Sequence, residues 1–271
     1  MILLVASLKD VASKNIAQKL LENYRFKEVS EKFQNNPIYV RKVRGKEVKM
    51  IFINEDSIYA QFITDFFKPE LLIFLSRHSS ASGTPTLSVH TPGNLGSAEF
   101  GGKPRKVSIS PASAMRDALL EMARLRNEKG LKYDVSYECT HHGPSLDVPT
   151  MFVELGSSPK QWMDLEAAEV VAHAAMAAAS KNSRYLTRLG IGGPHYNRKF
   201  TRMALNNEIA FGHMIPKYAI PYVDLEILKS CVERTLEKVD AAVIEWKGIS
   251  GSDRGRILNM LKEIGLPIER I

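Results

Sequence analysis

Short apolar runs alternate along the chain with longer stretches of helical periodicity. The apolar runs suit buried strands, which we expect at residues 2–7, 48–53, 71–75, 86–90, 106–109, 133–137, 150–155, 187–191, 208–213 and 241–245. Apolar residues three and four positions apart predict helices at residues 11–22, 111–129, 159–180, 224–239 and 253–264. This alternation predicts an α/β fold with a mixed, largely parallel sheet flanked by helices.

Residues near the helix ends support these boundaries. At the start of one expected helix, Ser158 provides an N-cap, Pro159 a first-turn proline and Gln161 the glutamine of a capping box. Gly130 and Gly265 stand where helices are expected to stop.

The expected helix at 224–239 carries an amphipathic stripe that we assign to the core. The stripe consists of Leu228, Cys231, Val232, Thr235, Leu236 and Val239. The chain has only two cysteines, Cys139 and Cys231, and their spacing fits neither a disulfide framework nor a zinc ribbon. Both are expected to be reduced.

The chain is expected to form a single α/β domain over residues 1–271. It has no internal repeat, no low-complexity tract and no long Gly/Ser linker. Residues 76–105 are rich in Ser, Gly, Thr and Pro and show little helical periodicity. We therefore expect long, ordered loops there that contribute to a site.

Neither apolar stretch that could suggest a membrane or export segment has the required pattern. The run at residues 1–8 has no basic residues ahead of it and reaches charged residues too soon. The alanine-rich stretch at 167–179 is interrupted by Glu169 and His173. We expect a cytoplasmic protein that does not engage a membrane.

The charge balance allows a polyanionic partner without requiring one. There are 37 basic and 30 acidic residues, a formal charge of +7 and a pI near 9.3. Basic residues gather at 41–46, 103–106 and 198–202. These clusters are either solvated surface or a phosphate-binding face, and the sequence leaves both interpretations open.

Five of the seven histidines lie at or just beyond the end of an expected strand. They are His78, His90, His141, His142 and His195. In open α/β sheets, ligands bind beyond the carboxyl ends of strands, where loops converge. Neutral imidazoles are the commonest metal ligands and the usual general bases at neutral pH, so this placement predicts a site.

The other two histidines have simpler explanations. His173 lies among alanines on an expected helix, where a structural hydrogen bond is the better interpretation. His213 follows an apolar run, and a structural and a functional role are equally open.

The densest chemical segment, Tyr-Glu-Cys-Thr-His-His-Gly-Pro, begins at the end of one expected strand. If the strand continues, Cys139 and His141 point to one face. Glu138, Thr140 and His142 then point to the other face. The two adjacent histidines are therefore expected to have different roles, one binding a metal or orienting a carbonyl and one acting as base.

The sequence contains no standard metal or nucleophile motif. His-Glu-x-x-His, paired Cys-x-x-Cys and Gly-x-Ser-x-Gly are all absent, so a metal site must be assembled from distant segments. Ser79, Ser80 and Cys139 are conceivable nucleophiles near histidines, but hydrogen-bonding loop roles suit the two serines better. Glu154 supplies a carboxylate at another strand end and could be a metal ligand, a partner of a histidine or a binder of a substrate ammonium.

Several of these segments together resemble the archaeal and plant type of D-aminoacyl-tRNA deacylase. The resemblance spans nearly the whole chain and is carried by residues 76–80, 89–94, 138–144, 154–157 and 192–196. It implies hydrolysis of the ester that joins a D-amino acid to the terminal ribose of tRNA. It also implies zinc as cofactor, tRNA as partner and a core related to nucleoside phosphorylases and peptidyl-tRNA hydrolases.

On this resemblance we assign provisional roles to the candidate residues. The catalytic residues are expected to be His141, His142 and Glu154, and the zinc ligands His78, His90 and His141. Backbone and side chains of the glycine- and serine-bearing loops are expected to bind substrate, namely Ser79, Ser80, Gly93, Asn94 and His195. The basic clusters would receive the acceptor stem, and the chain is expected to be a monomer or a weak dimer.

Two other functions remain open from the sequence. A phosphorylase-like enzyme or hydrolase acting on an N-glycosidic bond predicts turnover of free nucleosides without metal. A non-catalytic RNA-binding protein would not need so many imidazoles at strand ends, and more exposed aromatic residues would be expected for base stacking.

Overall fold

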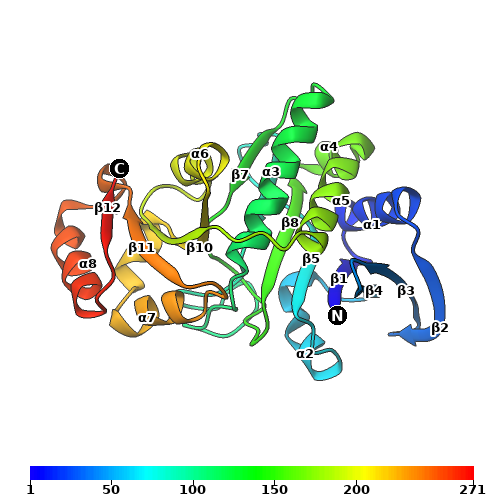
Figure 1. Ribbon diagram of the computed structural model, residues 1–271, viewed down its shortest axis with the longest axis horizontal. Helices are drawn as coiled ribbons and strands as arrows, with labels where there is room; N and C mark the ends of the chain where they lie inside the picture. Colours follow the sequence, from blue (N-terminus) through cyan, green and yellow to red (C-terminus); the bar gives the residue numbers. More distant parts are fainter.

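A computed structural model describes residues 1–271, and it confirms the predicted mixed α/β fold (Figure 1). The strands are β1 (Ile2–Ser7), β2 (Lys27–Phe33), β3 (Asn36–Val43), β4 (Lys46–Ile53), β5 (Leu71–Arg77), β6 (Thr86–His90), β7 (Asp134–Tyr137), β8 (Thr150–Gly156), β9 (Leu186–Ile191), β10 (Ile209–Ile215), β11 (Val239–Ile244) and β12 (Ile268–Arg270). The helices are α1 (Val11–Asn23), α2 (Ile63–Phe66), α3 (Ala112–Glu128), α4 (Pro159–Trp162), α5 (Leu165–Ser180), α6 (Arg198–Asn206), α7 (Leu225–Glu233) and α8 (Gly251–Glu263), with short 3-10 turns η1 (Ser57–Phe62), η2 (Lys217–Tyr222) and η3 (Trp246–Gly248).

The larger sheet has eight strands in the order β2-β3-β4-β1-β5-β8-β6-β7. Its centre, from β4 through β1 and β5 to β8, is parallel. Two parts depart from this direction: the β2-β3-β4 meander is antiparallel, and β6 runs antiparallel to β8 while remaining parallel to β7. The reversal between β8 and β6 matters for the site described below.

Side chains of the central strand β1 alternate between two apolar layers, as a strand buried on both faces requires. Leu4 and Ala6 pack in the core cluster that includes residues of α1, α3 and α5. Leu3 and Val5 point to the opposite face and pack with residues of η1 and α2. The helices of the first layer cover their face closely, whereas the second face is covered mainly by short turns and loops.

A second sheet, in the order β10-β9-β11-β12, is parallel throughout. Phe211 and Met214 of β10 belong to the same core cluster as α3 and α5, so the two sheets share apolar packing. A smaller cluster lies between this sheet and helices α7 and α8. The expectation of a single domain over residues 1–271 stays a prediction.

Several elements differ from the sequence-based expectation for identifiable reasons. Residues 106–109 form only isolated bridges. The helix expected at 159–180 is interrupted where Asp164 caps a new helix by accepting from the amides of Glu166 and Ala167. The helix expected at 224–239 stops at Glu233, because β11 must begin at Val239 to pair with β9.

Elements without an apolar run escaped prediction. Strand β2 is largely solvent-exposed, and β3 is only partly buried. Helix α6 is short and strongly basic, and β12 is a short edge strand. Ser158 does cap α4 with Pro159 in the first turn, although its side chain makes no hydrogen bond to the helix amides.

Two further observations bear on the sequence-based expectations. No helix in the structure has the length and apolar character needed to cross a bilayer. Cys139 and Cys231 are both free and buried. Cys231, on α7, packs in the core cluster, as the amphipathic stripe predicts, but Leu236 of the same stripe is 59% exposed.

Candidate active site

Four polar side chains lie in a row across one face of the larger sheet. Strand register pairs Ser76 with Glu154 and Ser88 with Glu154, and it places His90 beside Phe152, so these positions share a face. His78 follows β5 on the same side. Glu138 extends β7 by one residue, and its amide still donates to the carbonyl of Val89. The row is therefore His78, Glu154, His90 and Glu138, contributed by β5, β8, β6 and β7.

The floor beneath this row is aromatic. Phe74 and Phe152 stack with ring centroids 4.7 Å apart, and the imidazole of His90 stacks on Phe152 at 5.1 Å. All three side chains are fully buried. The polar groups thus lie on an apolar base, where the low dielectric strengthens their mutual electrostatic interactions.

Glu138 is the centre of the charged part of the cluster. Its side chain is fully buried, and its Oε2 accepts from Nε2 of His195 at 2.9 Å. The same Oε2 lies 3.6 Å from Nε2 of His141. Oε1 lies 3.1 Å from Nδ1 of His78 without hydrogen-bond geometry and has no hydrogen-bond partner. One buried carboxylate therefore faces three imidazoles.

His78 is held from three sides. Its Nδ1 lies 3.3 Å from Oε2 of Glu154, and its Nε2 is hydrogen-bonded to the hydroxyl of Tyr196. Gly156 packs directly on it, because a Cβ there would come within 2.7 Å of the His78 Cβ. The ring is consequently fixed in position between two buried carboxylates.

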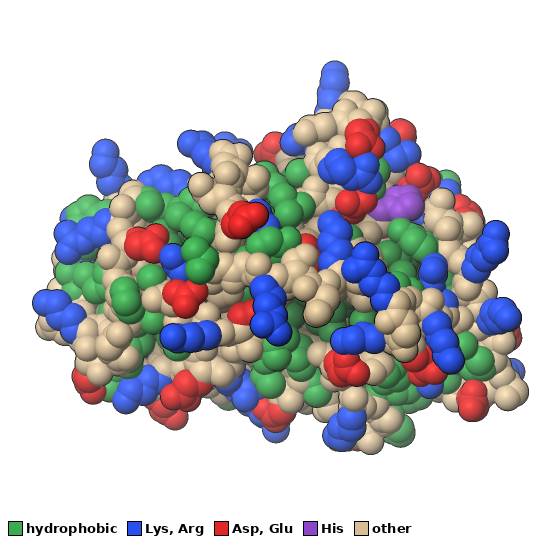
Figure 2. Space-filling view, in the orientation of Figure 1, with side chains coloured by type: hydrophobic (Ala, Val, Ile, Leu, Met, Phe, Trp, Pro, Cys, Tyr) green, Lys and Arg blue, Asp and Glu red, His purple; other side chains and the backbone are tan.

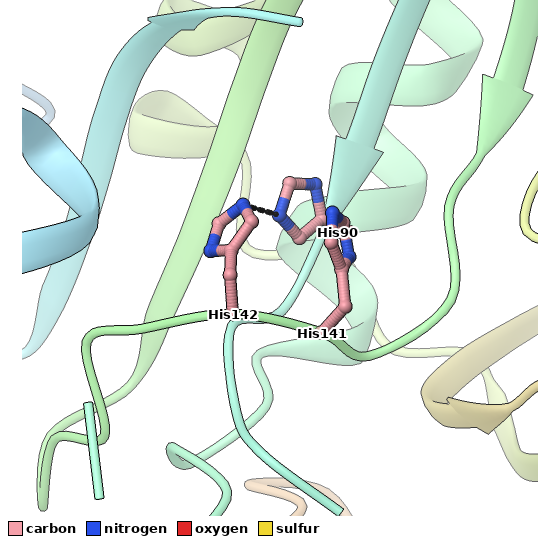
Figure 3. Close-up of side chains that lie close together, drawn as sticks. All are labelled: His90, His141 and His142. Atoms are coloured by element: carbon pink, nitrogen blue, oxygen red, sulfur yellow. Dashed lines mark hydrogen bonds between the residues drawn. The ribbon is translucent and has the colours of Figure 1, made fainter. Parts of the chain in front are cut away.

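A separate group of three imidazoles comprises His90, His141 and His142 (Figure 3). Nε2 of His90 lies 3.2 Å from Nε2 of His142, and the ring centroids of His90 and His141 are 4.4 Å apart. Nδ1–H of His141 donates to the carbonyl of Cys139 at 2.8 Å, and Nδ1–H of His142 donates to the carbonyl of Gly143 at 2.6 Å. Because these bonds place the proton on Nδ1, Nε2 of both rings keeps its lone pair, which in His142 faces Nε2 of His90.

The backbone that presents His141 and His142 is sharply turned. His142 has a φ of +42°, in the left-handed region. Gly143 follows, and any Cβ there would lie 2.2 Å from the amide nitrogen of Gly102 and 2.6 Å from the carbonyl oxygen of Ile58. Only glycine allows this close approach, so the loop with both histidines packs against the 100–102 loop.

His195 reaches the cluster from the second sheet, after β9. Besides Glu138, it contacts Sγ of Cys139 through Nδ1 at 3.3 Å and the hydroxyl of Tyr218 at 3.2 Å. The Tyr218 hydroxyl also lies 3.1 Å from Sγ of Cys139. Cys139 is 1% exposed, so its thiol is buried.

The charged members of the cluster shift one another's pKa strongly. Burial opposes ionisation of Glu138, but the imidazoles of His78 and His195 outweigh burial and hold its pKa well below the usual range. Burial would lower the pKa of His78, yet Glu138 and Glu154 raise it to about 11. Likewise, Cys139 and Glu138 overcome burial and raise the pKa of His195 to about 10. Burial raises the pKa of Glu154.

In the three-imidazole group, the pKa values are lowered rather than raised. Burial lowers the pKa of His142 to about 4, and burial together with neighbouring imidazoles holds the pKa values of His90 and His141 well below the usual range. These rings are therefore neutral at physiological pH, the state in which imidazole binds a metal.

The cluster opens into a cavity of about 510 Å³. The lining residues are Asp10, Asp56, Ser57, Ile58, Tyr59, Ser76, Arg77, His78, Ser79, Phe100, His141, His142, Glu154 and His195. Three acidic side chains face a single basic one, apart from the histidines. The cavity is large enough for an aminoacyl group.

Comparison with known proteins identifies the family. A family model described as D-aminoacyl-tRNA deacylase matches residues 65–269. The D-aminoacyl-tRNA deacylase of Pyrococcus abyssi is 41% identical over 266 residues, covering 95% of each chain. That of Methanosarcina acetivorans is 34% identical over 280 residues, covering 98% of this chain and 91% of the relative.

This chain belongs to the D-aminoacyl-tRNA deacylase family. The resemblance inferred from the sequence motifs is confirmed. A crystal structure described as a conserved protein of unknown function has a TM-score of 0.88 and 29% identity, covering 100% of this chain and 95% of that one. The expected relation to nucleoside phosphorylases and peptidyl-tRNA hydrolases stays a prediction.

Most residues singled out from the sequence of this deacylase family member lie together. His141, His142 and Glu154, expected to be catalytic, line the cavity. The expected zinc ligands divide: His90 and His141 group with His142, whereas His78 groups with Glu138 and His195.

The expected substrate-binding residues have different positions. Ser79 and His195 line the same cavity, and Ser80 lines a neighbouring one. Gly93 and Asn94 line neither cavity. Asn94 is buried and donates to the carbonyls of Gly101 and Lys103, and the Gly93 amide donates to the carbonyls of His141 and His142. These two residues position loops.

One prediction about the histidine-bearing segment is wrong. Glu138 and His141 were expected on opposite faces of a continuing strand, but their side chains approach within 3.6 Å. Strand β7 ends at Tyr137, and the turn at His142 then redirects the backbone. His141 and His142 consequently face the same group rather than opposite sides.

The two remaining histidines have structural surroundings. The Tyr24 hydroxyl lies 2.6 Å from Nδ1 of His173, as the structural interpretation predicts. His213 is fully buried, with Nδ1 3.0 Å from the Thr140 hydroxyl and Nε2–H donating to the Arg234 carbonyl at 3.2 Å. It supports the turn beneath the cluster.

Glu138 and Tyr218 are among the residues that sequence reasoning did not assign to the site. Glu138 carried a usable signal, because it directly follows an expected strand within the densest chemical segment. Tyr218 carried none, since it comes from η2 and reaches Cys139 only through folding.

The three basic clusters are not equivalent. In the first, Lys46 pairs with Glu70, and in the second, Arg105 pairs with Asp224 and Lys106 with Asp147. On the face shown in Figure 2, basic side chains are spread among acidic ones rather than gathered in one patch. Only the 198–202 cluster lines a large cavity next to the site.

Proposed function

We propose that this chain hydrolyses the ester bond between a D-amino acid and the terminal ribose of tRNA, releasing the free D-amino acid and tRNA. Membership of the D-aminoacyl-tRNA deacylase family supports the reaction class. The observation that carries the proposal is the convergence of His78, His141, His142, His195 and Glu154 on one cavity.

The reaction requires a positioned water, a proton acceptor and groups that hold the ester. The water oxygen bonds to the ester carbonyl carbon, the bond from that carbon to the ribose oxygen breaks, and the ribose oxygen leaves with a proton. Glu154 is suited to accept the proton of water, because only its Oε2 is engaged by His78. Asp56 lines the same cavity and would bind the amino acid's ammonium group in place of its present partner, Nη2 of Arg77, which lies 3.4 Å from its Oδ1.

The residues present fit a zinc ion. His90, His141 and His142 bring neutral imidazole nitrogens within 4.8 Å of one another, and carbonyl oxygens fix the protons of two of these rings on Nδ1. Nδ1 of His90 and Oε1 of Glu138 are buried without hydrogen-bond partners, which polar atoms rarely are. These three histidines would hold the ion, which would supply Lewis acidity to polarise an ester carbonyl and activate water.

The remaining cluster residues would act by holding positions and charge. His78 is fixed between Glu138 and Glu154 and keeps Glu154 oriented toward the cavity. Selection of the D enantiomer would be steric, with the side chain of an L-amino acid directed at the cavity wall formed by η1. Which enantiomer is cleaved would therefore depend on the shape of the cavity as well as on the polar side chains that line it.

The decisive experiment incubates the protein with D-tyrosyl-tRNA and L-tyrosyl-tRNA, with and without a chelator and restored zinc. We expect rapid release of D-tyrosine only, loss with chelator and recovery with zinc. His141→Ala and His78→Ala should each reduce the rate, while His173→Ala serves as a control away from the cavity. Equal rates on both enantiomers, or unchanged rates in both cavity variants, would contradict the proposal.

The same preparation tests the two alternative functions. Release of free base or sugar phosphate from nucleosides without metal would favour an N-glycosidic hydrolase or phosphorylase. Binding of tRNA without turnover of either enantiomer would favour a non-catalytic RNA-binding protein.

A further inference from the structure

A second cavity adjoins the histidine cavity, with a volume of about 970 Å³. It lies between the 80–86 loop, the start of β7 and helix α6. The lining residues are Ser80, Ser82, Thr84, Thr86, Arg126, Asp134, Val135, Ser136, Pro194, Tyr196, Arg198, Lys199, Thr201, Arg202, Leu205, Asn206 and Glu245. Nothing in the reaction described above uses this space.

Consecutive residues of the chain line the two cavities. Ser79 lines the histidine cavity and Ser80 the second one, and the same alternation holds for His195 and Tyr196. The Tyr196 hydroxyl, in the wall of the second cavity, is hydrogen-bonded to Nε2 of His78. A molecule held in the second cavity would therefore touch the wall of the reaction site.

The cavities differ in their charge balance. In the histidine cavity, three carboxylates face Arg77 and the imidazoles of His78 and His195, whose pKa values are raised to about 11 and about 10, so the charges roughly cancel. Four basic and two acidic side chains line the second cavity. Nη2 of Arg198 lies 3.6 Å from Oδ2 of Asp134, and Nζ of Lys199 lies 3.4 Å from Oε1 of Glu245. Arg202 is exposed and forms no ion pair. A phosphate is thus favoured in the second cavity over the histidine cavity.

We propose that the second cavity binds the 3′-terminal nucleotide of tRNA, so that the ester lies at the boundary between the two cavities. This inference rests on the proposed function. An aminoacyl ester is attached directly to the terminal ribose, so the nucleotide must occupy space next to the reaction site. The excess of basic side chains in the second cavity would hold the nucleotide's phosphate there and leave the amino acid in the histidine cavity.

The lining offers a partner for each part of a nucleotide. Lys199 and Arg202, one turn of α6 apart, face the position of the phosphate. Arg126 has a buried Nε without a hydrogen-bond partner, although its Nη1 already donates to the Tyr133 carbonyl at 2.9 Å. Hydroxyl groups of the 80–86 loop suit a sugar, and the Tyr196 ring offers a surface for base stacking.

The first test measures KM and kcat for D-tyrosyl-tRNA with Lys199→Gln, Arg202→Gln and the double variant. Lys262→Gln is the matched control, because Lys262 is exposed on α8 and lines neither cavity. We expect KM to rise about tenfold in the double variant while kcat stays within about twofold of wild type. The slope of log(kcat/KM) against log salt should become shallower by about 0.7 for each charge removed. Unchanged KM and slope would overturn the proposal.

A second test uses a nucleotide probe that needs no catalysis. The trinucleotide 5′-CCA-3′, the single-stranded end common to tRNAs, is titrated into the wild-type protein and the same variants by calorimetry. We expect binding that weakens in the double variant and is unaffected in Lys262→Gln. Equal binding by all variants would show that the nucleotide lies elsewhere. Absence of D-tyrosyl-tRNA hydrolysis by the wild type would instead contradict the proposed function, and the titration would still report on the cavity.

Discussion

The Oε2 atom of Glu138 lies 2.9 Å from Nε2 of His195, although 57 residues separate them in the sequence. The contact joins the residue that follows β7 of the larger sheet to the loop that follows β9 of the second sheet. It also fixes the His195 ring, whose other nitrogen faces Cys139 and Tyr218. The fully buried carboxylate of Glu138 thus connects the site residues of the larger sheet with His195 of the second sheet.

Glu138→Gln is expected to reduce deacylation while leaving the fold intact. The amide keeps the size of the side chain but removes the charge that faces His78, His141 and His195. Loss of a partner that orients metal-binding or catalytic imidazoles typically costs about 10- to 100-fold, which we expect in kcat/KM. The measurement is steady-state hydrolysis of D-tyrosyl-tRNA, with Glu226→Gln as the control because that side chain is 86% exposed.

Histidine NMR provides a second measure of the same variant. Because the charge of Glu138 helps to raise the pKa values of His78 and His195, both pKa values should fall toward the ordinary range in Glu138→Gln. Circular dichroism should match the wild type, whereas the Tm should fall, because a buried ion pair loses one partner. Unchanged histidine titration would show that Glu138 does not set the charge of the cluster.

Much of this site could be predicted because strand ends leave a strong signal in the sequence. His78, His90 and Glu154 each lie at or near the end of an apolar run, and chain position alone identified them. The segment that contains His141 and His142 stood out by its density of reactive side chains. Each of these positions follows from where a strand ends along the chain, and that does not depend on the order of the strands in the sheet.

Their grouping could not be predicted, because it depends on strand direction and register. Strand β6 runs antiparallel to β8, so His90 lies beside Phe152 in the sheet and not at the carboxyl edge where His78 lies. The site therefore occupies a face of the sheet rather than the expected crevice at its edge. Exposed elements were missed for a different reason: β2 and α6 have charged sequences, and tertiary context rather than apolar periodicity stabilises them.

His142→Ala is expected to weaken zinc binding, because it removes one of the three neutral imidazoles grouped with His90 and His141. Zinc content after dialysis against a weak chelator, measured by atomic emission, should fall well below that of the wild type. His173→Ala is the matched control, since that imidazole contacts Tyr24 and lies outside the group. If the zinc content of both variants equals that of the wild type, these histidines are not the ligands.

Zinc removal should also lower thermal stability. A ligand that binds only the folded state stabilises it in proportion to the logarithm of its concentration relative to its Kd. Chelator should therefore lower the Tm of the wild type and have a smaller effect on His142→Ala. The same drop in both proteins would point to a metal site elsewhere in the chain.

His213 predicts a pH dependence of stability that is separate from catalysis. Burial lowers its pKa to about 4 from an ordinary value of 6.5, and it outweighs the hydrogen bond to the Arg234 carbonyl, which acts to raise the pKa. Between those values the unfolded chain binds more protons than the folded one, so stability is complete above pH 6.5 and falls as the pH approaches 4. The contribution lost is about 3 kcal/mol. In His213→Gln, the free energy of unfolding measured in urea should change less over this range than in the wild type.

The close approach at Gly143 predicts opposite effects for two glycine substitutions. Gly143→Ala would drive a methyl group into the backbone of Gly102 and Ile58, displacing the loop that carries His141 and His142. We expect a loss of about 1–3 kcal/mol in the free energy of unfolding and a larger proportional loss of activity. Gly255→Ala, inside α8 with nothing within 4 Å of the added carbon, should instead stabilise by about 0.5–1 kcal/mol. Urea unfolding and D-tyrosyl-tRNA hydrolysis separate the two effects: if Gly143→Ala retains full activity at wild-type stability, the histidine loop is not held by this contact.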